Sequence, residues 1–243
     1  MHDPAILDDL GAALTIDGMT KTWTLLLIVI ASALVPARDA IAQRRSWWQT
    51  TPVQTSRYYV IRTDLPVDAA RRYARHLDRM YEEYARRLAS LPPRVPEKLN
   101  VYLFQRQSDY QYTLRTRFGI DGTGTGGMFF VNGQGSGMAI WVESLPERRV
   151  HHVMQHEGFH QFAYSRFGAD LPMWVNEGLA EFFGEAVLVS NRLVIGQSTP
   201  RTLFEIQNAV EDNRYVPFPE MVAMTSQEWN ANVRNGRSGN QYR

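Results

Sequence analysis

Two histidines in the pattern His-Glu-x-x-His are the feature of this chain best suited to chemistry. They are His156 and His160, with Glu157 directly after the first. On a helix, residues four apart turn about 400° and rise about 6 Å, so both imidazoles leave one face. Two nitrogens placed in this way can reach one metal ion at about 2.0–2.1 Å. Glu157 borders the same face, where it can hydrogen-bond a metal-bound water rather than ligate the metal.

A catalytic zinc site commonly has three protein ligands and one open position, so a third ligand must come from elsewhere in the chain. Glu177 is the best candidate because it lies seventeen residues after His160, on a second predicted helix. The interval holds the turn signals Gly168 and Pro172. A helical hairpin formed by that turn would bring the two helices side by side. We therefore expect His156, His160 and Glu177 to hold one Zn²⁺ ion.

A carboxylate further along the second helix is suited to orient these histidines. Glu181 follows Glu177 by four residues and therefore lies on the same helix face. Zinc-bound histidines commonly donate their other ring N–H to such a carboxylate. We expect Glu181 to accept this hydrogen bond, with Asp170 as the weaker candidate for the role.

The metal-site interpretation competes with a structural one. The chain has only six histidines, and two histidines plus a glutamate at this spacing should arise by chance in roughly one such chain in a hundred or fewer. The alternative is a pair of helix histidines on a buried seam beside a solvated Glu157. A set of two histidines and one carboxylate can also hold iron. The helical context, the secretory signal and the second acidic motif favour the metal site, and zinc is favoured over iron because this donor set is a known catalytic zinc site.

The remaining histidines are expected to have no catalytic role. His152 lies four residues before His156 and can extend its face, but a site needs only three protein ligands. A structural or surface role is therefore predicted for His151 and His152, and His2 and His76 are predicted to be incidental. The aromatic residues of the second motif that we expect in the core are Trp174, Phe182 and Phe183.

The composition limits the classes of function. The 243 residues suffice for one sizeable domain or two small ones. The formal net charge of +1 gives no reason to expect nucleic acid as a partner. Cysteine is absent, which excludes disulfides, thiolate metal sites and a lipidated cysteine anchor. Any metal must therefore be held by His, Asp or Glu.

An apolar run at residues 25–35 indicates an export signal. Lys21 precedes it, and Ala-Ile-Ala at 40–42 gives the small-x-small pattern of a cleavage site, which predicts Gln43 as the mature start. The run is shorter than the roughly 20 apolar residues of a spanning helix, so we expect no stable membrane span after cleavage. The expected location is periplasmic or extracellular. An uncleaved membrane anchor is the alternative.

The first 18 residues do not suit an export signal. They carry four aspartates and neither Lys nor Arg, whereas the leading region of a signal is positively charged. Met19 would be a better start. The predicted organisation is a signal region at 1–42, a linker at 43–56 and one domain at 57–243.

The periodicity of apolar residues predicts an α+β fold, with a small N-terminal mixed sheet, a motif helix and a mainly helical C-terminal part. Ser108 is predicted to cap a short helix. Expected strands are 58–63, 99–104, 128–131, 138–142 and a short hairpin at 188–189 and 193–195. Expected helices are 66–90, 108–118, 147–166, 172–187 and further helix up to about 234, interrupted by Pro217 and Pro219.

The Gly-rich segment 122–127 is not a phosphate loop, because no Gly-Lys-Ser/Thr follows it. One strand of the hairpin after it can offer an open edge to an extended peptide, which would bind by strand addition. A merely flexible loop is the alternative interpretation of the glycines.

The two motifs resemble those of the gluzincin branch of zinc metallopeptidases, in which the motif helix gives two His ligands and a later helix gives a Glu. The phrase Trp-Val-Asn-Glu-Gly-Leu-Ala-Glu-Phe-Phe at 174–183 is similar to the second motif of the peptidase MA-like superfamily. Within it, the chain resembles a largely uncharacterised family of secreted bacterial domains over about residues 57–243. The resemblance implies a zincin-like fold, His156, His160 and Glu177 as zinc ligands, and Glu157 as catalytic base.

The chain departs from this pattern in two ways. The interval between His160 and Glu177 is short for gluzincins, and the chain stops at Tyr242-Arg243 where another helix would be expected. We therefore expect a C-terminally truncated domain. Related peptidases use a later Tyr or His to stabilise the oxyanion, a role for which Tyr242 or Tyr215 is available.

The leading hypothesis is an exported zinc peptidase that cleaves peptide or protein substrates with a metal-activated water and Glu157 as general base. One alternative is a secreted domain whose metal site is structural or vestigial. Another is an interaction module tethered to the membrane by residues 25–35.

Overall fold

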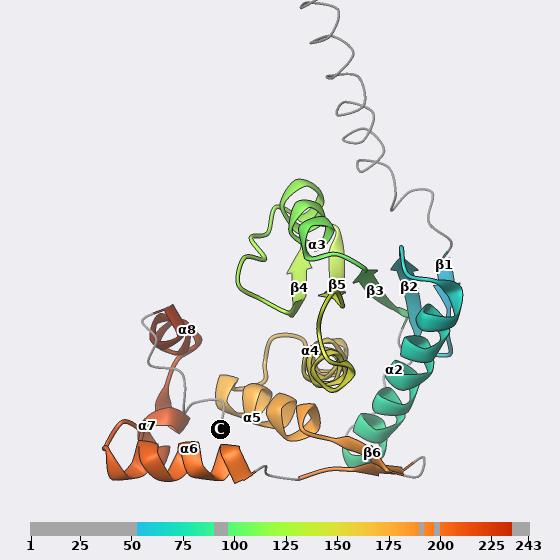
Figure 1. Cartoon of the computed structure of the whole chain (residues 1–243). Helices are drawn as coiled ribbons and strands as arrows, with labels where there is room; N and C mark the ends of the chain where they lie inside the picture. The colour runs from blue at the N-terminus through green and yellow to red at the C-terminus, as the bar shows by residue number, and fades with distance from the viewer. Residues whose placement is uncertain (1–52, 90–96, 190–191, 197–199, 235–243) are drawn as a thin grey trace, which may run out of the picture. The chain divides into compact units, whose positions relative to one another are not determined.

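A computed structural model describes residues 53–89, 97–189, 192–196 and 200–234. Its largest sheet has five strands in the order β1-β2-β3-β5-β4 (Figure 1). The β2–β3 and β3–β5 pairs are parallel, and both edge strands are antiparallel to their neighbours. The mixed sheet confirms the predicted α+β class. The strands are β1 (Val53–Thr55), β2 (Tyr59–Thr63), β3 (Leu99–Phe104), β4 (Gly127–Asn132) and β5 (Gly135–Trp141).

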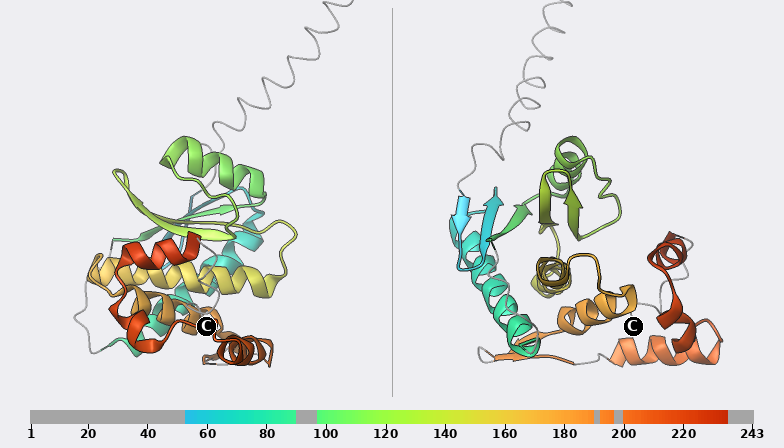
Figure 2. Two further views of the ribbon diagram at one scale, coloured as in Figure 1. Left: turned by 90° about the vertical axis from the view of Figure 1, so that its left-hand side faces the viewer. Right: turned by 180° about the vertical axis from the view of Figure 1, so that it is seen from behind.

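Helices cover both faces of this sheet (Figure 2). On one face lie α2 (Val67–Arg87) and α4 (Glu147–Phe167), which also contact each other. On the other lies α3 (Gln107–Thr113), which continues into a π-helical turn, η1 (Leu114–Phe118). The apolar faces of α2 and α4 and the inner residues of β2, β3 and β5 form one buried core. Burial of this apolar area is what holds the motif helix against the sheet.

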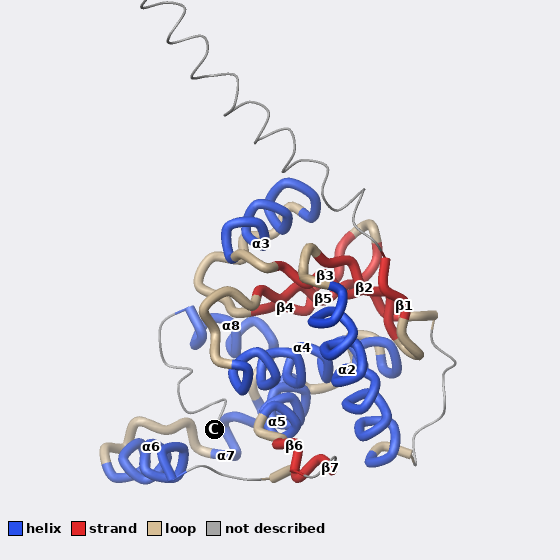
Figure 3. The backbone as a smooth tube through the Cα atoms, turned by 45° about the vertical axis from the view of Figure 1, so that its right-hand side comes forward, coloured by secondary structure: helices blue, strands red, loops and turns tan. Residues whose placement is uncertain are grey.

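A second helix, α5 (Met173–Gly184), packs along α4 (Figures 1 and 3). Pro172 precedes it with an extended backbone and Gly168 ends α4 with a φ of 66°, so the predicted turn residues do form the turn. A short hairpin follows, made of β6 (Val187–Val189) and β7 (Arg192–Val194). The chain continues in α6 (Pro200–Glu211), α7 (Phe218–Ala223) and α8 (Ser226–Arg234).

Three details of the predicted elements are wrong. The expected linker contains β1, because residues 53–55 pair antiparallel with β2. Ser108 does not cap a helix, since α3 already begins at Gln107 and its N-cap is Arg106. The second motif helix ends at Gly184, before the predicted 187, because Val187 is in the first strand of the hairpin.

None of the described helices is long and apolar enough to cross a membrane. The predicted signal at 1–42 lies outside the described residues, so its cleavage and the expected location stay predictions.

Candidate metal centre

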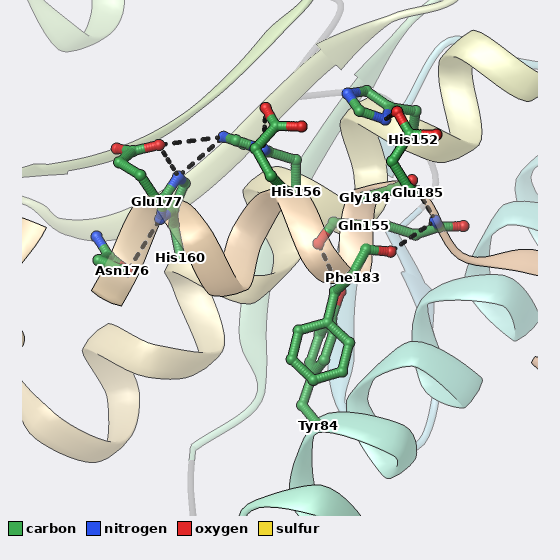
Figure 4. Close-up of polar contacts among 11 residues, drawn as sticks. Tyr84, His152, Gln155, His156, His160, Asn176, Glu177, Phe183, Gly184 and Glu185 are labelled. Carbon is green, nitrogen blue, oxygen red and sulfur yellow. Dashed lines mark hydrogen bonds and ion pairs between the residues drawn. The ribbon is translucent and has the colours of Figure 1, made fainter. Parts of the chain in front are cut away.

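The three predicted ligands come together between α4 and α5 (Figure 4). The Nε2 atoms of His156 and His160 lie 3.1 Å apart. Glu177 Oε2 lies 3.5 Å from the first and 3.4 Å from the second. Tetrahedral ligands held at about 2.0–2.1 Å from zinc are about 3.3–3.4 Å from each other. The spacing of the three atoms therefore fits one zinc ion without rearrangement.

These ligands are nearly buried, with side-chain exposures of 14% for His156 and 11% for both His160 and Glu177. Burial lowers the pKa of His156, but contacts with Glu177 and Glu181 outweigh this effect and raise the pKa to about 10. Burial raises the pKa of Glu177, but its hydrogen bonds to the two histidines outweigh this and lower the pKa to about 2. The local field therefore favours positive charge at this point, which suits a divalent cation.

The other ring nitrogens of the two histidines have oxygen partners on α5. Glu181 Oε1 lies 3.3 Å from His156 Nδ1, close enough for an ion pair but without hydrogen-bond geometry, so the predicted hydrogen bond is not formed here. Asn176 Oδ1 lies 3.1 Å from His160 Nδ1. Such contacts fix the ring orientation of a metal-binding histidine. Asp170, the weaker candidate, is exposed in the loop between the helices.

Asn176 was not assigned a role from the sequence. Its position directly before Glu177 is a usable signal, because helix neighbours are about 100° apart and flank one face. A polar residue beside a predicted ligand can therefore reach the outer nitrogen of a histidine bound on that face.

Glu157 lies beside the centre and is held by the sheet. The backbone N–H of Phe129 on β4 donates to Glu157 Oε2 at 2.7 Å. Phe129 directs this N–H away from β5, so the open edge of β4 lies next to the carboxylate. The second oxygen, Oε1, takes no part in this hydrogen bond.

Gln155, one residue before His156, joins three elements. Its buried amide nitrogen donates to the carbonyls of Phe183, Gly184 and Ala186 at 2.9, 2.8 and 3.0 Å (Figure 4). Its Oε1 lies 3.0 Å from His76 Nε2, and its own carbonyl accepts a hydrogen bond from Tyr84. The end of α5 is thereby fixed to α4 and α2. No local sequence pattern indicates this role.

Among the other described histidines, His76 departs from its prediction. His76, predicted to be incidental, is only 5% exposed and stacks on His151 at 4.0 Å between ring centroids. Burial is the main reason that the pKa of His76 is lowered to about 3. His152 lies on the α5 side of α4, with Nδ1 3.5 Å from Glu185 Oε1. His2 lies outside the described residues.

The aromatic residues predicted to lie in the core and the tyrosines predicted to stabilise the oxyanion differ in outcome. Phe183 is in the core at 1% exposure, Phe182 is 39% exposed, and Trp174 packs edge-on against Phe218. Tyr242 lies outside the described residues. Tyr215 is 43% exposed in the segment between α6 and α7. The oxyanion-stabilising residue therefore stays a prediction.

Comparison with protein families matches residues 151–223 to a family described as "Protein of unknown function (DUF1570)". The matched segment begins within α4 and contains His156, His160 and Glu177. No curated protein matches the chain. The family description names no activity, so the function must be argued from the site.

Proposed function

We propose that the chain is a zinc-dependent hydrolase that cleaves peptide bonds. The observation that carries this proposal is the convergence of His156, His160 and Glu177, whose ligand atoms lie 3.1–3.5 Å from one another beside Glu157. The donor set of two histidines and one glutamate is that of known catalytic zinc sites with an open position. Likeness of both motifs to gluzincins supports the same reading.

A zinc ion held by His156, His160 and Glu177 would acidify a bound water and polarise a substrate carbonyl. Glu157 Oε1 accepts the proton of the attacking water as its oxygen bonds to the carbonyl carbon. The C–N bond then breaks, and Glu157 returns that proton to the departing amine nitrogen. The Phe129 N–H keeps Oε2 in place throughout, so only one carboxylate oxygen is available for the proton.

The edge of β4 is the proposed substrate-binding surface. In the part of the chain that the structure describes, β4 is the outermost strand of its sheet. Alternate residues Gly127, Phe129 and Val131 direct their backbone groups away from β5, and of these groups the Phe129 N–H is already donated to Glu157. An extended peptide added to this edge would lie beside Glu157, with its side chains alternating between the two faces of the sheet.

Export is part of the proposal because the predicted signal precedes the domain. N-terminal sequencing of the protein from cells should find Gln43 as the first residue. A protein that keeps residues 25–35 and remains in the membrane fraction would instead favour the tethered alternative.

The central test uses three variants of the full-length protein, supplied with zinc and a broad peptide library. Glu157→Gln should keep zinc and lower turnover by about 10²–10⁴-fold, because it removes the general base. His160→Ala should lose zinc. Glu147→Gln is the matched control, since this glutamate is 72% exposed at the start of the same helix.

Each outcome has a definite meaning. Turnover that survives Glu157→Gln would show that the base is assigned wrongly. Zinc binding by the wild type without cleavage of any peptide between about pH 6 and 9, where zinc-bound water titrates, would favour a non-catalytic metal site.

A further inference from the structure

The seam between α4 and α5 repeats its histidine–carboxylate contacts beyond the proposed zinc centre. Along α4, histidines occur every fourth residue, and along α5 glutamates occur every fourth residue in the opposite direction. The histidines are His152, His156 and His160, and the glutamates facing them in order are Glu185, Glu181 and Glu177. Only part of this ladder is used by the zinc centre.

The unused end has ligand atoms close together. His152 Nδ1 lies 3.5 Å from Glu185 Oε1, near the separation of about 3.3 Å expected for two ligands of one zinc ion. His152, His156 and Glu181 also present ligand atoms that all lie within 4.8 Å of one another. Figure 4 shows His152 and Glu185 side by side, one turn of α4 away from His156.

Gly184 makes room for this arrangement. A Cβ atom at position 184 would lie 3.2 Å from His152 Cε1 and 3.3 Å from His152 Nδ1. Such contacts are tighter than ordinary van der Waals distance, so any larger residue would displace the imidazole. The glycine therefore lets the ring lie directly over the end of α5.

The charges around His152 also suit a cation. Burial is the main reason that the pKa of His152 is lowered, which disfavours the protonated ring. Two carboxylates face it, from Glu181 and Glu185. The exposed Arg148 approaches the far oxygen of Glu185 at 3.7 Å, which leaves Oε1 facing the imidazole. Arg149 is the other nearby positive charge.

We propose that His152 and Glu185, joined by Glu181 when it turns away from His156, form a second site for a zinc-type divalent cation, one helical turn from the first. Nitrogen and carboxylate donors together suit zinc better than calcium or magnesium, which prefer oxygen alone. Its ligands are 20%, 26% and 31% exposed, more than those of the first centre. The second site is therefore the weaker and more accessible of the two.

The two sites share Glu181. This carboxylate lies 3.3 Å from His156 Nδ1 and is also a ligand of the second site. A cation that draws Glu181 toward His152 takes the oxygen partner away from His156. Filling the second site at high zinc should therefore weaken the first, and by linkage the effect is mutual.

Zinc titration of the full-length, metal-free protein tests the proposal without any need for catalysis. The wild type should bind two zinc ions per chain, one at each of the two sites, with different affinities. His152→Ala and Glu185→Gln should each lose the weaker ion and keep the tighter one. His160→Ala should show the reverse. His151→Ala is the matched control, because that ring stacks on His76 away from α5 and its loss should leave both ions bound.

Several results would overturn the second site: a wild type that binds only one zinc ion, a His152→Ala variant that keeps two, or a His151→Ala variant that loses the weaker ion as well. Circular dichroism of each variant establishes that it is folded, and Glu185→Gln serves if His152→Ala is not. An activity assay, which does rest on the proposed function, should show inhibition by excess zinc in the wild type and not in His152→Ala. Absence of any turnover would count against the hydrolase proposal and leave the binding result intact.

Discussion

Replacement of Gln155 by leucine should destabilise the protein strongly, although the two side chains are similar in size. Gln155 is 1% exposed, and its amide nitrogen donates hydrogen bonds to carbonyls at the end of α5. In the leucine variant the carbonyls of Gly184 and Ala186 would lose this donor. Water could not replace it, because the leucine side chain would fill the same buried space. The carbonyl of Phe183 suffers less, because it also accepts from the Ala186 N–H at 3.1 Å.

The magnitude follows from the number of carbonyls left without a donor. A buried polar group that loses its partner costs about 1–3 kcal/mol. Two such groups give a loss of about 3 kcal/mol, a large share of the roughly 5–15 kcal/mol that stabilises a typical domain. With a urea slope of about 2 kcal/mol/M, the midpoint of unfolding should fall by about 1.5 M.

Gln161 provides a matched control on the same helix. It is also 1% exposed, but its Nε2 donates to a single carbonyl, that of Asn100, at 2.9 Å. Its Oε1 has no hydrogen-bond partner. Leucine at 161 removes one hydrogen bond together with an unpaired buried oxygen, so the net cost should be about 1 kcal/mol or less.

Urea unfolding of the two metal-free variants, followed by far-UV circular dichroism, distinguishes the roles of the two glutamines. The reasoning fails if Gln155→Leu and Gln161→Leu shift the midpoint equally, or if the second is the more damaging. In that case the contacts of Gln155 with α5 would contribute no more than one ordinary hydrogen bond.

Three further predictions concern the surroundings of the site. The pKa of His76 is lowered to about 3 in the folded protein, mainly by burial, so protonation favours unfolding. The free energy of unfolding should therefore fall as pH drops below about 6.5, by about 2 kcal/mol at pH 5. Urea titrations at about pH 6.5 and about pH 5 should show a smaller loss for His76→Gln than for the wild type. Asn176→Ala removes the oxygen partner of His160 and should weaken zinc binding by about 10–100-fold, measured in competition with a chromophoric chelator. An unchanged zinc affinity would show that Asn176 does not orient His160. Gly127→Ala places a Cβ 2.5 Å from Val153 Cγ1 and should cost about 1–3 kcal/mol in thermal unfolding, a loss that would be absent if β4 can move away from α4.

The elements that carry the site could be predicted because their signals are local. The motif helix was expected at 147–166 and is found at 147–167. The start of α5 was marked by Pro172, and the hairpin of β4 and β5 by its glycines and alternating apolar residues. Each signal depends only on neighbouring residues, so one sequence suffices to detect it.

Contacts between distant segments could not be predicted in the same way. His76 and Gln155 are 79 residues apart, and each looks like an ordinary polar position on its own helix. Their burial depends on how α2, α4 and α5 pack together, and no local sequence pattern predicts that packing. The antiparallel pairing of β1 with β2 was missed for the same reason, since residues 53–55 form a strand only because β2 lies beside them.

The alignment of α5 against α4 matters more to the site than any one ligand. A shift of α5 by one residue would move its side chains about 1.5 Å along the axis and rotate them by about 100°. Because the three glutamates repeat every four residues, that rotation would carry all of them off the seam together. Pro172 fixes where α5 begins, and Gln155 holds its last carbonyls. The ligand geometry is therefore set at both ends of α5, by residues that need never touch a metal ion.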